Sequence, residues 1–224
     1  MEIYTLLVLL TVLFLIWYYF NFHHTFEMVY AKSNYDDRSY LVRNLPDKEE
    51  AANILAYIRS LLSSLSQRLE IAYPTDPRIK LLTSRYRPDS IQEAPENSKS
   101  TSYSVNKGEN LVFCIRSRTA DASFVPKNTV VFVALHELAH IICISHGHTP
   151  EFWECFRYLL AHAVKWKLYE PVDYKLKAEP YCGTVISDTP LLTGDVAKYV
   201  AFDDKNIDVS SVPLPKPVYV TSKV

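Results

Sequence analysis

The stretch VALHELAHIICISHGHTPEFW, residues 133–153, holds four of the seven histidines of this 224-residue chain. Its first two histidines, His136 and His140, are four positions apart. On a helix with 3.6 residues per turn both imidazoles therefore project from one face. Glu137 lies at the edge of the same face. The pattern predicts a helix that presents two metal ligands beside one carboxylate, which is the H-E-x-x-H arrangement of zinc hydrolases.

Two imidazoles are too few for a catalytic zinc, which takes three protein ligands and leaves a fourth position for water. The candidates for the third ligand are His148 and His146. His148 directly precedes Thr149, a predicted helix N-cap with proline next to it, so a loop reversal would deliver His148 to the ion. We expect His148 to be the ligand and His146 to be its substitute or a neighbour of the site. The alternative is that HExxH occurs here by chance, in a helix that binds no metal. The isolated histidine His162 is expected to have a structural role.

The amino terminus carries no charge from residue 3 to residue 22. A helix needs about 20 apolar residues to span a bilayer, and the aromatic residues at positions 17–19 suit the headgroup region. This pattern predicts a single-pass transmembrane anchor, with a signal peptide or a buried helix as alternatives. Because Lys32 and Arg38 follow the segment and no basic residue precedes it, the bulk of the chain is expected on the cytosolic side.

Composition limits the remaining classes of function. The net charge is −1 and no basic run is present, so nucleic acid is not an expected partner. The four cysteines are scattered without a CxxC pair, which favours reduced core thiols over disulfides. They are Cys114, Cys143, Cys155 and Cys182.

The rest of the chain predicts an α+β fold. Apolar residues at helical spacing indicate a long helix over 44–70, and a shorter helical piece is expected near 77–86. Alternating residues around a glycine-containing turn predict a β-hairpin over 101–117, followed by helices over 125–145 and 149–168. The expected domains are a transmembrane anchor (1–22), a connector (23–45), a domain of helices and a short antiparallel sheet that carries the histidine motif (46–185), and an extended tail (186–224).

At the histidine motif the chain resembles the SprT-like and WLM-type zinc metallopeptidases, in VALHELAH followed by GHTPEFW. The resemblance extends to membrane-anchored or virion-associated versions from large DNA viruses, so a virion membrane is also a predicted location. It implies a zincin-like fold, Zn²⁺ held by His136, His140 and His148, and Glu137 as general base. The near-neutral charge departs from the DNA-binding members, so cleavage of DNA–protein crosslinks is not carried over.

These features predict a zinc-dependent metallopeptidase that acts on a protein or peptide substrate. Residues 111–116 are expected to offer a free strand edge to that substrate, and Tyr181 is a candidate for stabilising the oxyanion. The alternative is a structural or interaction protein of a membrane or virion, in which zinc only stabilises an inactive zincin fold and His146 is a fourth ligand. The substrate and the oligomeric state do not follow from the sequence.

Overall fold

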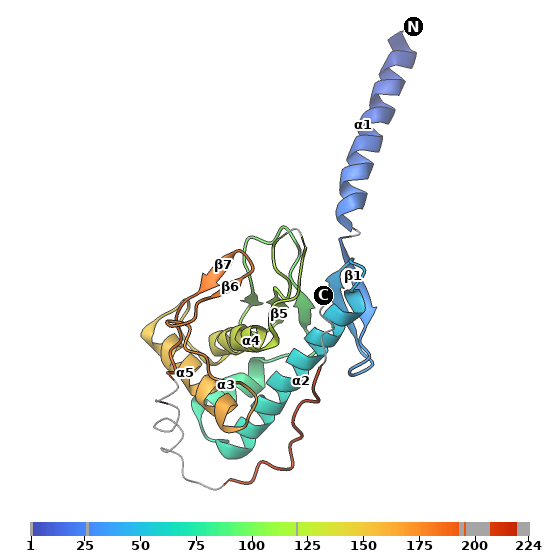
Figure 1. Cartoon of the computed structure of the whole chain (residues 1–224). Coiled ribbons are helices and arrows are strands. Elements are labelled where there is room, and N and C mark those ends of the chain that lie inside the picture. The colour runs from blue at the N-terminus through green and yellow to red at the C-terminus, as the bar shows by residue number, and fades with distance from the viewer. Residues whose placement is uncertain (1, 26, 120, 193–194, 196–206, 219–224) are drawn as a thin grey trace.

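The computed structural model describes residues 2–25, 27–119, 121–192, 195 and 207–218, with the side chains of the first helix described over residues 3–19. Within this part of the chain five helices and seven short strands form (Figure 1). They are α1 (Glu2–Thr25), β1 (Met28–Lys32), β2 (Ser39–Arg43), α2 (Lys48–Ala72), α3 (Pro77–Arg85), β3 (Ile91–Glu93), β4 (Tyr103–Val105), β5 (Asn110–Phe113), α4 (Lys127–Ile142), α5 (Pro150–Lys165), β6 (Glu179–Tyr181) and β7 (Thr184–Ile186).

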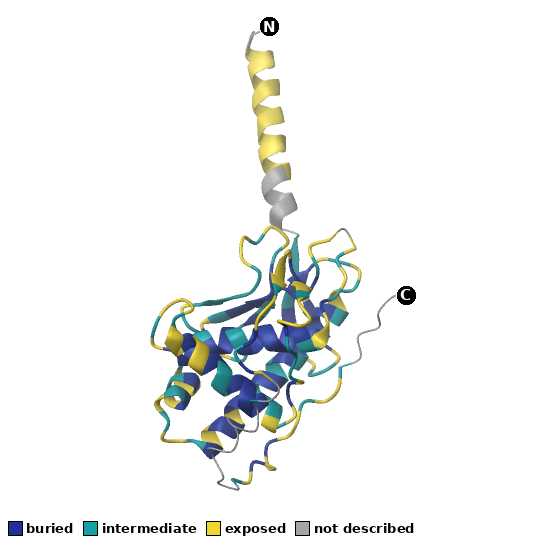
Figure 2. Ribbon diagram, turned by 60° about the vertical axis from the view of Figure 1, so that its left-hand side comes forward, coloured by how far each residue is buried: buried dark blue, intermediate teal, exposed yellow. Residues whose placement is uncertain are grey.

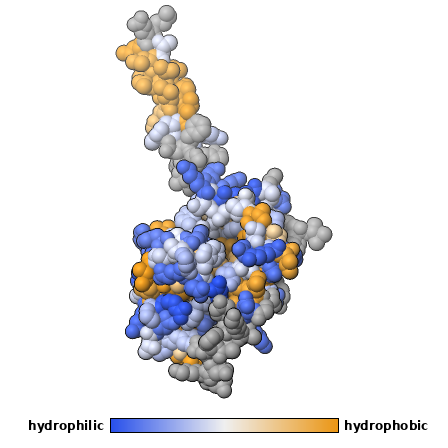
Figure 3. All heavy atoms as spheres, turned by 90° about the vertical axis from the view of Figure 1, so that its left-hand side faces the viewer, coloured by the Kyte–Doolittle hydropathy of each residue, from blue (hydrophilic) through white to orange (hydrophobic). Residues whose placement is uncertain are grey.

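Helix α1 extends away from the rest of the molecule, and its side chains from residue 3 to residue 19 are exposed (Figures 1 and 2). Hydrophobic side chains gather over it, whereas the face of the body in Figure 3 is largely hydrophilic. The predicted transmembrane anchor is wrong, because no helix in the described residues has the length and apolar character that a bilayer crossing requires. The polar residues Thr5 and Thr11 and the aromatic residues at positions 17–19 lower the mean hydropathy of the described stretch. Residues 20–22 of the predicted segment lie outside the described side chains.

The predicted localisation and the predicted fold class both depended on the transmembrane anchor, so both are corrected. The predicted membrane localisation, with its cytosolic orientation or virion membrane, rested on that segment and is wrong for the same reason. The fold class is corrected to a mixed fold of helices and small sheets, without a bilayer-spanning helix among the described residues.

The core is centred on α2, which packs against α3, α4 and the hairpin β1–β2. Apolar residues recur along α2 at helical spacing, and this stripe faces inward (Figure 2). Its fully buried leucines are Leu55, Leu61, Leu62, Leu65 and Leu69. The segment expected to be an irregular connector instead forms the β1–β2 hairpin, which buries Tyr40 and Val42 against the body.

The central sheet has the strand order β3–β5–β4. Strand β5 pairs in parallel with β3 and antiparallel with β4, so both of its edges are occupied. The predicted free edge at residues 111–116 is therefore wrong. Within this sheet β3 and β4 are the edge strands: β3 packs beside β2 and α2, whereas β4 contacts α4. The reason is that β3, which precedes the hairpin in the chain, occupies the other side of β5.

The chain after α5 wraps back over the sheet and forms the β6–β7 hairpin. Cys182, in the turn of this hairpin, is joined by a disulfide bond to Cys114 at the end of β5, across 68 residues of sequence. The prediction of reduced cysteines is wrong for this pair, because wrapping of the tail brings two distant residues together. It is confirmed for Cys143 and Cys155, which are free and buried.

Candidate metal centre and active-site cleft

His136 and His140 lie on the one side of α4 that faces a cleft. From residue 131 to residue 140 they are the only residues of this helix that are not buried. Their ring centroids are 5.0 Å apart. The apolar sequence of α4 thus packs the helix into the core on its other sides, which fixes the direction of the two imidazoles.

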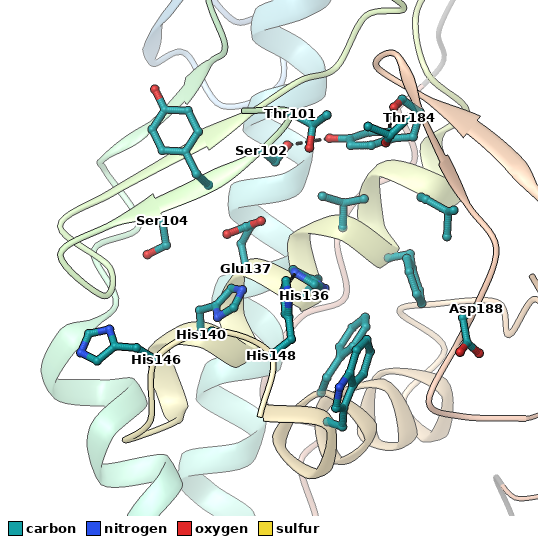
Figure 4. Close-up of a pocket in the computed structure, with 18 of the residues that line it drawn as sticks. Thr101, Ser102, Ser104, His136, Glu137, His140, His146, His148, Thr184 and Asp188 are labelled. Carbon is teal, nitrogen blue, oxygen red and sulfur yellow. Dashed lines mark hydrogen bonds between the residues drawn. The ribbon is translucent and has the colours of Figure 1, made fainter. Parts of the chain in front are cut away.

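His148 joins them from the loop between α4 and α5. Its Nε2 lies 3.0 Å from Nε2 of His136, and one ring nitrogen from each of the three histidines lies within 4.8 Å of the other two. Figure 4 shows the three rings converging, with Glu137 beside them. Three imidazoles that meet at one point are the donor set of a catalytic zinc site, in which a fourth position stays open.

Contacts at both ends of the loop hold His148 in place. The carboxylate of Glu151 accepts hydrogen bonds from the backbone amides of Ile144 (2.9 Å) and Ser145 (3.0 Å). The Lys107 ammonium group donates to the carbonyl groups of the same two residues, at 2.6 and 3.0 Å. Thr149 is the N-cap of α5, as predicted, because its hydroxyl accepts a hydrogen bond from an amide of the first turn at 3.3 Å.

The ring of Phe152 packs against all three imidazoles. Its side chain is fully buried, and its ring centroid lies 4.8 Å from that of His136, 4.3 Å from that of His140 and 4.7 Å from that of His148. A ring held in a packed core limits the rotation of the rings stacked on it. Phe152 therefore preorganises the candidate ligands.

Burial keeps the two helical imidazoles neutral. Desolvation, together with the neighbouring imidazoles, lowers the pKa of His136 to about 3. Desolvation, followed by the proximity of His148 and Lys107, lowers the pKa of His140 to about 4. Neutral imidazole is the form that binds metal ions, so the site is ready to accept one at neutral pH.

Glu137 is only 5% exposed, and its carboxyl group faces the cleft (Figure 4). Burial raises its pKa to about 8, and a hydrogen bond from the backbone amide of Ser104 acts in the opposite direction. A cation at the three histidines would favour the ionised carboxylate. The group is thus placed to exchange a proton near neutral pH.

The cleft that contains these groups has a volume of about 770 Å³. One wall is the edge strand β4 with the turn after it, the floor is α4 with the start of α5, and the opposite wall is β7 with residues 187–188. The β7 wall lies in the chain region that the sequence patterns predicted only as a loop. No local pattern indicated it, because its position over the cleft depends on the distant Cys114–Cys182 bond.

Other predicted residues lie apart from the three histidines. His146 lines the rim of the cleft and its side chain is exposed, away from the convergent rings (Figure 4). The hydroxyl of Tyr181 donates to the carbonyl of Cys114 (2.9 Å) and contacts the Ser102 hydroxyl (2.6 Å), which directs it to the sheet. His162 is buried and structural, as predicted, with its ring nitrogens bonded to protein oxygens.

Comparison with known proteins places the chain in a family. The WLM domain model matches residues 80–180. A protein of Acanthamoeba polyphaga mimivirus is 37% identical over 166 residues, which cover 72% of this chain and 84% of that protein. A protein of Invertebrate iridescent virus 6 is 30% identical over 135 residues, covering 55% of this chain and 71% of that protein. Both relatives are described as uncharacterized.

The chain therefore belongs to the WLM domain family, which is metallopeptidase-like. This confirms the resemblance seen at the histidine motif, and the relatives agree with the context of large DNA viruses. Among solved structures, Wss1 from Saccharomyces cerevisiae matches with a TM-score of 0.38 and 19% identity, over 55% of this chain and 84% of that chain. This likeness is too weak to carry an argument about the fold.

Proposed function

We propose that the chain is a zinc-dependent metallopeptidase, with His136, His140 and His148 as zinc ligands and Glu137 as general base. The observation that carries the proposal is the convergence of three imidazole nitrogens within 4.8 Å, next to a buried carboxylate in a cleft. A zinc ion held there would activate a water molecule and polarise the scissile carbonyl group as a Lewis acid.

Glu137 performs the proton transfers. Its carboxylate accepts a proton from the attacking water and then delivers it to the leaving amine. A general base works best when its pKa lies near the operating pH, and the buried position of Glu137 moves its pKa in that direction. The Ser104 amide that bonds to this carboxylate fixes its orientation.

The substrate is an extended stretch of protein or peptide. Strand β4 lines the cleft and has one edge without a strand partner among the described residues. An extended peptide can add to such an edge through main-chain hydrogen bonds, which impose little sequence preference. Because β4 lies beside α4, a peptide bound in this way would carry its carbonyl groups past Glu137 and the histidines.

The rival proposal, an inactive zinc-stabilised fold, requires a fourth protein ligand. Structural zinc sites are closed by four protein ligands, whereas catalytic sites keep one position open. His146 is the residue nearest in sequence that could close the site, and it lies outside the convergent group. The arrangement of the described residues thus favours the peptidase.

The test compares the full chain with its Glu137→Gln variant. Zinc content and cleavage of a denatured protein are measured together, with Glu70→Gln, an exposed site on α2, as the matched control. We expect Glu137→Gln to keep its zinc and to lose at least about 100-fold in cleavage rate, which is the lower range for a general base. His148→Gln should lose both zinc and cleavage. A Glu137→Gln variant that cleaves as fast as the parent chain would refute the proposed mechanism.

A further inference from the structure

A second group of metal-binding side chains lies where α4 meets α5. Cys143 is the C-cap residue of α4, Cys155 lies on α5, and Glu151 lies in the first turn of α5. The two sulfur atoms and one carboxylate oxygen all lie within 4.8 Å of one another. None of the three residues belongs to the histidine group, and the proposed peptidase mechanism uses none of them.

The chemistry of this group suits a soft or borderline cation. Thiolate sulfur selects ions such as Zn²⁺ and Cu⁺, and a carboxylate can complete a zinc site. Cys143 and Cys155 are 0% and 3% exposed, whereas Glu151 is exposed. The carboxylate therefore lies at the surface and the two sulfur atoms lie in the interior. An ion could therefore enter past the carboxylate and reach two preorganised sulfur atoms.

The two thiols differ in acidity, because they share a hydrogen bond. The thiol group of Cys143 donates a hydrogen bond to Cys155, which holds the pKa of Cys155 below its ordinary value. Lys107 on the turn after β4 and Arg78 on α3 add positive charge near the pair, against the negative charge of Glu151. The first proton to leave is therefore that of Cys155, whereas the shared hydrogen bond and burial raise the pKa of Cys143.

We propose that Cys143, Cys155 and Glu151 form a second metal site, which takes a thiolate-binding divalent cation such as Zn²⁺. An ion there would fasten the end of α4 to α5, at the base of the loop that carries His148, and would keep one coordination position for water. The Glu151 carboxylate already bonds to the amides of this loop, so metal binding and loop position share one side chain. The proposal does not depend on peptidase activity.

Cobalt binding tests the proposal directly. The full chain is stripped of metal and titrated with Co²⁺, because thiolate ligands give an intense charge-transfer absorption that imidazole and carboxylate ligands do not. We expect two equivalents to bind, one of them with the thiolate absorption. The chain has four cysteines, and mass spectrometry first verifies that Cys114 and Cys182 are bonded to each other, so the absorption can come only from Cys143 and Cys155.

Substitutions then assign the two equivalents. Cys143→Ser and Cys155→Ser should each abolish the thiolate absorption and remove one equivalent, with circular dichroism as the check of folding. The matched control is His136→Gln, which should lose the other equivalent and keep the absorption. Absence of thiolate absorption in the unsubstituted chain would overturn the proposal even if the variants fail to fold. Absorption that persists in both cysteine variants would overturn it as well. Neither result would bear on hydrolysis at the histidine site.

Discussion

Arg116 is the centre of a buried ionic network that ties the sheet to α2, and its replacement should be among the most damaging single changes. Its side chain is 1% exposed. The guanidinium group donates to Glu93 at 2.8 Å and to Asp47 at 2.6 Å. Glu93 is also 1% exposed, and its other oxygen accepts a hydrogen bond from the backbone amide of Arg43 at 2.8 Å.

Substitution Arg116→Met keeps much of the side-chain volume and removes the charge. Glu93 then remains buried with one amide as its partner, and breaking a buried pair in this way costs about 3–5 kcal/mol. We expect the free energy of unfolding, measured by urea denaturation, to fall by this amount. Replacing both partners, in Arg116→Met with Glu93→Leu, should restore most of the loss, because no uncompensated charge remains.

The pH dependence gives a second readout of the same network. Burial raises the pKa of Glu93 above 4.5, against the opposing effect of Arg116. Without Arg116 this pKa should rise further, so in Arg116→Met the stability is retained below pH 4.5 and lost as the pH rises through the folded-state pKa. The deficit of the variant should therefore be smaller at low pH than at neutral pH. The reasoning fails if Arg116→Met costs less than about 1 kcal/mol, or if the double variant loses the sum of the two single losses.

Three further predictions concern the frame of the cleft. Gly108→Ala should lower the melting temperature more than Gly147→Ala does. The added methyl group at Gly108, at φ +111°, meets a backbone oxygen of α3 at 2.8 Å, whereas at Gly147 nothing lies within 4 Å. Phe152→Ala should cost about 3–5 kcal/mol in urea denaturation and should weaken zinc binding in a chelator competition, because the three imidazoles lose their common support. Reduction of Cys114–Cys182 should lower the free energy of unfolding by about 4 kcal/mol, as expected for a loop of 68 residues; an unchanged urea midpoint would contradict this.

Several features of this protein follow from short-range patterns in its sequence. The spacing of His136 and His140 determines that both rings share one face of α4, because helix geometry acts within four residues. Thr149 and the following proline determine where α5 begins, and the recurrence of leucines determines which side of α2 is buried. The sequence motif also identified the family that the comparisons confirmed.

The side chain of Asp47 illustrates a contact that rules based on neighbouring residues do not predict. The sequence allows either Asn44 or Asp47 as the N-cap of α2. Asp47 occupies that position, yet its side chain makes no capping hydrogen bond and pairs with Arg116 instead. A buried arginine that is 69 residues away in the chain competes for the same carboxylate and forms a charge-assisted hydrogen bond with it. A capping rule considers only the nearest neighbours and does not include that competitor.

Only the tertiary structure decided which strand edge is open to the cleft and which cysteines pair, and it brought the predicted His148 to the other two histidines. Strand β3 covers one edge of β5, so β4 is left facing α4. The wrapped tail brings Cys182 to Cys114, and the contacts of Lys107 and Glu151 place His148 beside His136. Each of these results depends on segments that lie more than one helical turn apart in the chain. Their contacts are fixed by packing of the whole chain, whereas helix spacing and caps are fixed within a single turn.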